Sequence, residues 1–235
     1  MIKINFIGYG VWGKKIYPII KKIHDTKVKL FKKNNISDKN SIWDFIFTNN
    51  KTHYSLVKKS IMNGKNVYCE KPLVENVAKA KELYKLSKKF NKKLYVCDVE
   101  NFKKIQISLK KNNTVVRKKY SKDKRNILWR LAYHDFTYIY KLTKGKKISK
   151  IKIIKSGPGF INFKVRICNK NFNFYYSLNS KNKIHSFNNT SLLSKKNYYL
   201  IMIKNLINNK NIDFDLNKKI SIYCIKVIST IALLK

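Results

Sequence analysis

The chain has 235 residues, 44% of them hydrophobic, so it can form one large domain or two small ones around a real core. Its formal net charge of +41 comes from 53 basic residues against 12 acidic ones. This composition argues against a disordered chain, and no run approaches the ~20 apolar residues of a membrane helix. We expect a soluble protein with no membrane partner.

The positive charge has two explanations. Phosphate contacts release counterions, so a basic surface binds any polyanion. However, lysine, asparagine and isoleucine are all abundant, as an AT-rich coding sequence produces through codon usage. Readers of phosphates and bases favour arginine, and the chain has only four: Arg117, Arg125, Arg130 and Arg166. We therefore prefer a solvated surface and expect nucleic acid to bind only non-specifically.

The cysteines indicate neither a disulfide framework nor a metal site. They lie far apart without a C-x-x-C pair, at Cys69, Cys97, Cys168 and Cys224. The opening segment is too short for the apolar core of a signal peptide and runs straight into a glycine motif. We expect a cytoplasmic protein without a metal.

The first motif is GYGVWG, a G-x-G-x-x-G that follows a β-rich run at Ile2–Ile7. Isoleucines then recur at three- and four-residue spacing, which predicts a helix after the glycines. In this context Gly8 allows a tight turn, Gly10 lets a pyrophosphate approach the backbone, and Gly13 lets helix and strand pack closely. The candidate dinucleotide contacts here are Gly8, Tyr9, Gly10, Val11, Trp12 and Gly13.

The next strand is expected at Val28–Phe31. An NAD-binding unit would carry an acidic residue about 20 positions after the glycines for the ribose hydroxyls. The chain has Lys32 and Lys33 there instead. A cationic strand end suits the 2′-phosphate of NADP, although two lysines can equally belong to the general surface. We favour NADP slightly over NAD, with Lys32 as a candidate contact.

Strands and helices alternate to residue 102. Further strands are expected at residues 43–48 and 92–99, and residues 66–73 are expected to form a strand that runs into a loop. A helix ending at Gly64 and another around Leu83 separate them. The fold class predicted is α/β: a Rossmann-type doubly wound parallel sheet that forms a dinucleotide-binding domain over residues 1–102.

The second half, residues 103–235, predicts an α+β domain with an open, mostly antiparallel sheet. Turn signals such as GPG and NSKN separate short β-rich runs. The expected strands are 105–110, 114–120, 150–155, 160–167, 172–179 and 183–187. The expected helices are Asn126–Leu142, Tyr198–Ile207 and Ile220–Leu234. We expect the aromatic residues of this domain mainly in the core.

Three blocks resemble, in order and spacing, the glucose-fructose oxidoreductase, inositol dehydrogenase and rhizopine-catabolism (Gfo/Idh/MocA) family. They are GYGVWG, the stretch from DFIFTNN to EKPL, and AYHD. The middle block is specific, with a turn at Thr48, His53 five residues later, a helix ending in NGK, and a strand ending in Glu70, Lys71 and Pro72. The likeness spans almost the full chain, and it implies that the second domain, residues 103–235, binds substrate and forms a homo-oligomer through its sheet.

The resemblance implies an NAD(P)-dependent oxidoreductase that moves a hydride between nicotinamide and a sugar, polyol or nucleotide sugar. A substrate hydroxyl would lie between two catalytic residues, Lys71 and His134. A histidine with a pKa near ~6.5 can take the hydroxyl proton, and an ammonium stabilises the developing alkoxide. The resemblance implies further cofactor contacts at Thr48, Asn49, His53, Glu70 and Lys71. Glu70 can equally form a plain ion pair, and a cis bond before Pro72 is an open alternative.

Two departures from the family pattern are plain. Arg130 stands one helical turn before His134, where family members usually carry an aspartate, and Asp135 cannot replace it on that helix face. The interval of residues 32–42 is also too short for the usual helix, strand and helix. A degenerate member that binds cofactor or partner without turnover is therefore the alternative.

Overall fold

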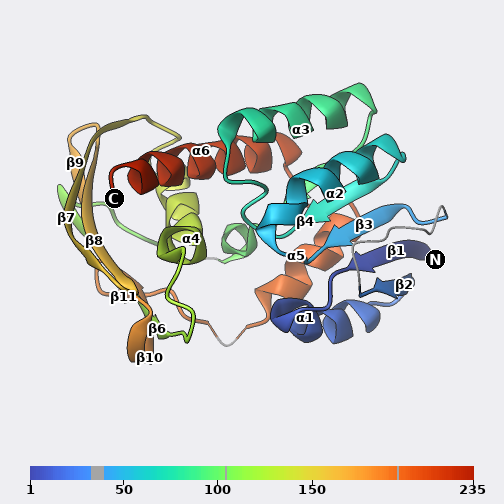
Figure 1. The fold of residues 1–235 in the computed structure, drawn as a ribbon, viewed down its shortest axis with the longest axis horizontal. Coiled ribbons are helices and arrows are strands. Elements are labelled where there is room, and N and C mark those ends of the chain that lie inside the picture. The colour runs from blue at the N-terminus through green and yellow to red at the C-terminus, as the bar shows by residue number, and fades with distance from the viewer. Residues whose placement is uncertain (33–39, 104, 195) are drawn as a thin grey trace. The chain divides into compact units, whose positions relative to one another are not determined.

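The computed structural model describes residues 1–32, 40–103, 105–194 and 196–235 (Figure 1). Lys33, named with Lys32 at the end of the second expected strand, lies outside these ranges. The chain divides into two compact units. The first comprises Met1–Phe102 and Tyr198–Ile225, and the second comprises Lys103–Asn197 and Lys226–Lys235.

The first unit contains a parallel sheet with the order β2-β1-β3-β4-β5. Its strands are β1 (Ile2–Ile7), β2 (Thr26–Phe31), β3 (Trp43–Ile46), β4 (Asn66–Cys69) and β5 (Leu94–Val96). Its helices are α1 (Val11–Lys21), α2 (Asn50–Met62), α3 (Val77–Lys89), the 3-10 turn η1 (Val99–Phe102) and α5 (Tyr198–Ile207). The predicted α/β class with a doubly wound parallel sheet is confirmed.

Side chains alternate between the two faces of this sheet, and both faces are covered (Figure 1). Phe6, Phe45 and Tyr68 point to the face that packs against α1 and α5. The opposite face packs against α2, which lies beside α3. Helices on both faces explain why β3 and β4 are apolar almost throughout, as buried parallel strands usually are.

Helix α5 belongs to the first unit, although the sequence analysis assigned residues 198–225 to the second domain. Met202, Ile203 and Leu206 are buried in the core cluster that also contains Ile4 and Phe6. Burial of this apolar stripe stabilises α5 against the first sheet, so the helix packs in the first unit although the residues before it belong to the second. The unit boundary after Phe102 lies where the sequence places the end of the first domain.

The second unit contains a six-stranded sheet with the order β11-β10-β6-β9-β8-β7. Only the β6–β9 pair is parallel, so the predicted open, mostly antiparallel sheet is confirmed. The strands are β6 (Asn112–Tyr120), β7 (Ile148–Gly157), β8 (Phe160–Ile167), β9 (Lys170–Ser177), β10 (Asn179–Phe187) and β11 (Thr190–Ser191). The helices are α4 (Ile127–Leu142) and α6 (Phe214–Leu233), of which α6 belongs to the first unit as far as Ile225.

Two expectations for the second half were wrong. Residues 105–110 form no strand, although their apolar residues alternate. Asparagine side chains take the place of ladder bonds there, since Asn113 Oδ1 accepts from the Lys110 N–H at 2.9 Å and Asn188 Nδ2 donates to the Ser108 carbonyl at 3.1 Å. Helix α6 also begins at Phe214 instead of Ile220, because Asp213 Oδ1 caps it by accepting from the Leu216 N–H at 2.8 Å.

Aromatic side chains fill the core of the second sheet. The rings of Phe163 and Phe174 stack with centroids 4.5 Å apart, and Tyr176 meets Phe163 edge-on at 5.6 Å. All three are buried, which confirms that the aromatic residues of this sheet lie mainly in the core.

In the ranges that the structure describes, no helix has the length and apolar character needed to cross a membrane. The same residues contain no cluster of histidine, cysteine and carboxylate groups that could hold a metal. All four cysteines are free thiols.

Candidate active site

The carboxyl ends of β1, β3 and β4 bring three predicted contacts to one edge of the first sheet. Gly8 follows β1, Thr48 follows β3, and Glu70 follows β4. The ladder continues past the strands, because the Phe47 N–H donates to the Ile7 carbonyl at 2.7 Å. Strand β1 has β2 on one side and β3 on the other, so this edge is the topological switch point where open α/β sheets bind ligands.

The three glycines of the motif have three different surroundings. Gly8 has a φ of +99°, and a Cβ there would lie 2.8 Å from the Phe47 carbonyl carbon. A Cβ on Gly13 would lie 2.4 Å from the Gly8 oxygen, so helix and turn pack at backbone contact. A Cβ on Gly10 would meet no protein atom within 4 Å. The space beside Gly10 therefore fits a ligand that approaches the backbone.

The N-terminus of α1 is open to such a ligand. Gly10 is its N-cap, no side chain of the described residues caps it, and its first turn contains no acidic residue. Val11 and Trp12 are 80% and 46% exposed. The unpaired N–H groups and positive end of a helix dipole favour an anion. The residues present thus fit the pyrophosphate of a dinucleotide.

The end of β2 carries the charge on which the predicted cofactor preference depends. Lys32 directly follows Phe31 and is exposed. The described residues at this strand end include no carboxylate that could take a ribose hydroxyl.

Glu70 is held by two tyrosines. Tyr68 Oη donates to Glu70 Oε1 at 3.0 Å, and the hydroxyl of Tyr199 donates to the same oxygen. Burial raises the pKa of both tyrosines well above the ordinary value, and the charge of Glu70 raises it further, so both remain protonated donors. The Trp12 ring also meets Tyr199 edge-on at 5.9 Å. Tyr199 therefore contacts both the glycine turn and Glu70.

Sequence reasoning missed Tyr199, which lies 129 residues from Glu70. No motif marks it. The only available signal was the apolar face of α5, which had been assigned to the other domain.

His53 lies between the turn at Thr48 and the turn at Pro72. It is 1% exposed, and its Nδ1 lies 2.8 Å from the Pro72 carbonyl while its Nε2 lies 3.2 Å from the Thr48 carbonyl. Burial lowers its pKa despite these carbonyls, which favours the neutral ring. A neutral ring has one N–H and donates to only one of the two carbonyls, and the shorter distance favours Pro72. A direct contact of His53 with the cofactor stays a prediction.

The turn after β4 has the backbone geometry left open by the sequence. The Lys71–Pro72 peptide bond is cis, and Lys71 is half-buried. Asn49 caps α2 by accepting from the Lys51 N–H at 3.1 Å, which leaves the side chain of Asn49 at the same edge. Glu70, Lys71 and Asn49 are therefore all positioned by regular elements of the first unit.

The other predicted catalytic residue, His134, lies on α4 in the second unit, where it is half-buried. Arg130, one turn earlier, donates through Nη2 to Ser121 Oγ at 2.7 Å and through Nη1 to the Asp123 carbonyl. The pairing of His134 with Lys71 stays a prediction, because the two residues belong to different units.

Asp135 has a structural role that the sequence did not indicate. It is fully buried, its Oδ1 lies 2.6 Å from His185 Nε2, and its Oδ2 accepts from Tyr176 Oη at 2.8 Å. Arg117 Nη1 lies 3.7 Å away and also donates to the Leu131 carbonyl at 2.9 Å. Burial alone would raise the pKa of Asp135, but the charges and hydrogen bonds of His185, Arg117 and Tyr176 lower it overall. These bonds tie α4 to the sheet.

The fold and this edge have the features of a dinucleotide-binding Rossmann unit. A family model described as "Oxidoreductase family, NAD-binding Rossmann fold" matches residues 36–97, and its name is that of the Gfo/Idh/MocA family. The resemblance stated from the sequence is thereby confirmed over this stretch. No curated protein matches the chain.

Solved structures share the fold of the whole chain. A dehydrogenase (MviM) from Clostridium difficile is 17% identical with a TM-score of 0.78, covering 100% of this chain and 99% of its own. UDP-N-acetylglucosamine 3-dehydrogenase GnnA from Acidithiobacillus ferrooxidans is 12% identical with a TM-score of 0.78, covering 96% of both chains. The WlbA dehydrogenase from Thermus thermophilus, in complex with NAD and UDP-GlcNAcA, is 11% identical with a TM-score of 0.77, covering 97% of this chain and 95% of its own.

Proposed function

We propose that the protein is an NAD(P)-dependent oxidoreductase that transfers a hydride between nicotinamide and a hydroxyl or ketone of a sugar, most specifically a nucleotide sugar. One observation carries the proposal. The carboxyl edge of the first sheet combines an open glycine turn at a helix N-terminus with the Glu70-Lys71-Pro72 turn. The first feature suits a pyrophosphate, and the second offers an ammonium at the same edge.

The cofactor would be held by residues of the first unit. The N–H groups that follow Gly10 would bind the pyrophosphate, and Lys32 favours the 2′-phosphate of NADP over NAD. Glu70, held by Tyr68 and Tyr199, would accept hydrogen bonds from the nicotinamide ribose. When bound, the nicotinamide supplies the hydride chemistry.

The protein's own part in the reaction is proton handling. The ammonium of Lys71 would donate to the reacting oxygen and stabilise the alkoxide as the hydride leaves the carbon. His134 would take the hydroxyl proton, or return it in the reverse direction. The network around Asp135 would hold α4, which carries His134, against the second sheet.

Two of the similar solved structures suggest the substrate class. GnnA is named a UDP-N-acetylglucosamine 3-dehydrogenase, and WlbA is in complex with UDP-GlcNAcA. We extend that class to this chain. A homo-oligomer formed through the second sheet and a location in a reducing cytoplasm complete the proposal, the latter supported by four free thiols.

The experiment compares the native protein with Lys71→Met. It measures the turnover of ketone forms of UDP-sugars with NADH and with NADPH. Removing the ammonium should abolish turnover and leave the fold intact, since a group that acts in the transition state contributes to kcat. Retained turnover in Lys71→Met would refute the assigned role.

A second candidate function, binding without turnover, is favoured by Arg130. Its guanidinium occupies the helix position one turn before His134 and is fixed by Ser121 and Asp123. If the native protein binds cofactor and yields no product with any sugar, and Arg130→Asp gains none, the binding role stands. Robust turnover by the native sequence excludes it.

A further inference from the structure

We infer that the second unit contains an oxyanion subsite for a phosphate or diphosphate group, with Lys119 and Lys183 as its direct ligands and Arg117 and Arg130 as fixed supporting charges. This deepens the proposed function, on which it rests for the assignment of that group to a nucleotide sugar.

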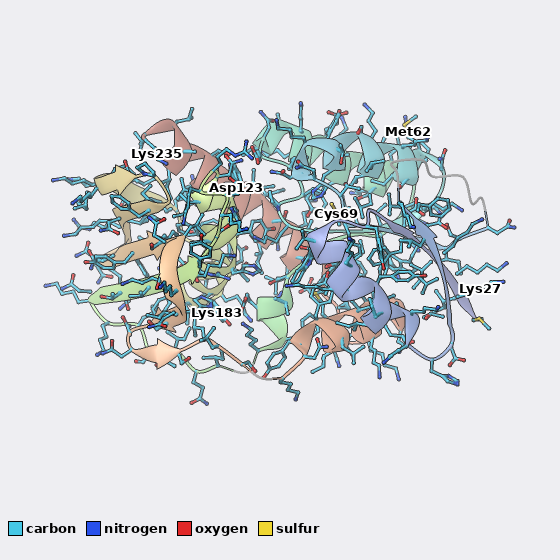
Figure 2. All side chains as sticks on the ribbon, turned by 60° about the horizontal axis from the view of Figure 1, so that its bottom comes forward. Lys27, Met62, Cys69, Asp123, Lys183 and Lys235 are labelled. Carbon is cyan, nitrogen blue, oxygen red and sulfur yellow. The ribbon has the colours of Figure 1, made fainter. Side chains whose placement is uncertain are left out.

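The four side chains come from three elements of one unit. Lys119 and Arg117 lie two residues apart on β6 and therefore on the same face. On the neighbouring strand β10, Ile184 pairs with Lys118, which places Lys183 beside the same end of β6. Arg130 reaches Ser121, just beyond that end, from α4. Figure 2 labels Lys183 and Asp123 within this unit.

The charges of these groups act on one another. Burial, followed by the charges of Arg117, Arg130 and Lys183, lowers the pKa of Lys119 to about 8. Lys119 is half-buried, and its ammonium forms no hydrogen bond or ion pair with another residue in the described ranges. A partly desolvated ammonium among three cations is unfavourable until a negative group joins it.

The protein cannot supply that negative group from this part of its sequence. Residues 103–197 include only two acidic side chains, Asp123 and Asp135. Asp135 is buried against His185, Tyr176 and Arg117. Asp123 accepts from Arg125 Nε at 3.0 Å, and one of its oxygens lies 3.9 Å from Arg130. Neither carboxylate bonds to Lys119, so we expect a ligand to supply its counter-charge.

The number and order of the cations favour a multiply charged oxyanion. Arg117 and Arg130 are held by the Leu131 carbonyl and by Ser121 Oγ, so their charges stay in place without a ligand. Ser121 accepts from Arg130, which leaves its own hydroxyl proton able to donate to an oxyanion. Asp135 and Asp123 lie close to Arg117 and Arg130, so two positive charges remain, those of Lys119 and Lys183. A phosphate, which carries about −1.5 to −2, matches them better than one carboxylate.

The experiment titrates the native protein, Lys119→Gln and Lys118→Gln with UDP and with inorganic phosphate at constant ionic strength. Lys118→Gln is the matched control, because it removes the same charge from the adjacent position on the opposite face of β6. Lys119→Gln should weaken UDP binding about tenfold or more, as loss of a charge-assisted hydrogen bond does, and Lys118→Gln by less than about twofold. Lys119→Arg should retain most of the affinity.

Equal weakening by both glutamine variants would overturn the inference, because it would mean attraction to the overall charge of the chain. Uridine that binds as tightly as UDP would also overturn the inference. So would binding of glucuronate that depends on Lys119 together with binding of phosphate that does not. A parallel hydride-transfer assay separates the two claims. If UDP binding depends on Lys119 but no hydride is transferred, the subsite stands and the proposed function is wrong. If hydride is transferred but UDP binding does not depend on Lys119, the proposed function stands and the subsite is wrong.

Discussion

Replacing Gly10 and Gly13 separately with alanine distinguishes cofactor binding from folding. A Cβ on Gly10 meets no protein atom within 4 Å, and Gly10 has an ordinary φ of −74°, so Gly10→Ala should reduce the free energy of unfolding by less than about 1 kcal/mol, the usual difference between N-cap residues. A Cβ on Gly13 lies 2.4 Å from the Gly8 oxygen, so Gly13→Ala should destabilise by about 1–3 kcal/mol, as overpacking does.

Gly10→Ala should weaken cofactor binding strongly, although it changes stability little. The new methyl group would stand where the pyrophosphate approaches the backbone and would remove at least one charge-assisted hydrogen bond from an N–H of α1. A loss of about 1.5–3 kcal/mol corresponds to roughly 10- to 100-fold weaker binding. Urea unfolding measures stability, and titration of NADH and NADPH by nicotinamide fluorescence measures affinity. Unchanged affinity in a folded Gly10→Ala protein would refute a pyrophosphate at this turn.

Two further substitutions test the supports of the site. Tyr199→Phe removes one hydrogen bond to Glu70 and should weaken binding of the nicotinamide cofactor about tenfold. Tyr54→Phe, which removes a surface hydroxyl that donates to Glu82, is the control and should leave cofactor binding unchanged. Equal cofactor affinities in the two variants would contradict the role of Tyr199. Asp135→Asn should destabilise the second unit by about 3–5 kcal/mol, since it leaves Arg117 in the network without its carboxylate. Because the folded-state pKa of Asp135 lies below the unfolded value of 3.8, its contribution is complete above about pH 3.8 and is lost as the pH falls through the folded pKa; acid unfolding that is identical in native and variant proteins would contradict this.

The sequence predicts the first unit well because its signals are local. The run Ile2–Ile7, the glycines at 8, 10 and 13, and the alternating strands and helices each depend on residues close together in the chain. The Glu70-Lys71-Pro72 turn was found from a motif for the same reason. Local pattern and sheet position agree in this half of the chain.

The features missed by the sequence depend on distant partners. Tyr199 reaches Glu70 across 129 positions, and α5 chooses its unit by burying an apolar stripe. Residues 105–110 alternate like a strand, but the side chains of Asn113 and Asn188 satisfy the backbone instead. Asp135 was judged only by its helix face relative to His134, whereas its partners lie on β6, β9 and β10. Tertiary contacts of this kind override local propensity.

The most direct test of the central claim follows the hydride itself. The native protein and Lys71→Met are incubated with NADH or NADPH deuterated at C4 and with ketone forms of UDP-sugars, and the sugar products are analysed by mass spectrometry. We predict that deuterium appears in the sugar with the native protein and is absent with Lys71→Met. Cofactor that binds to the native protein while no sugar or ketosugar gains the label would contradict an oxidoreductase.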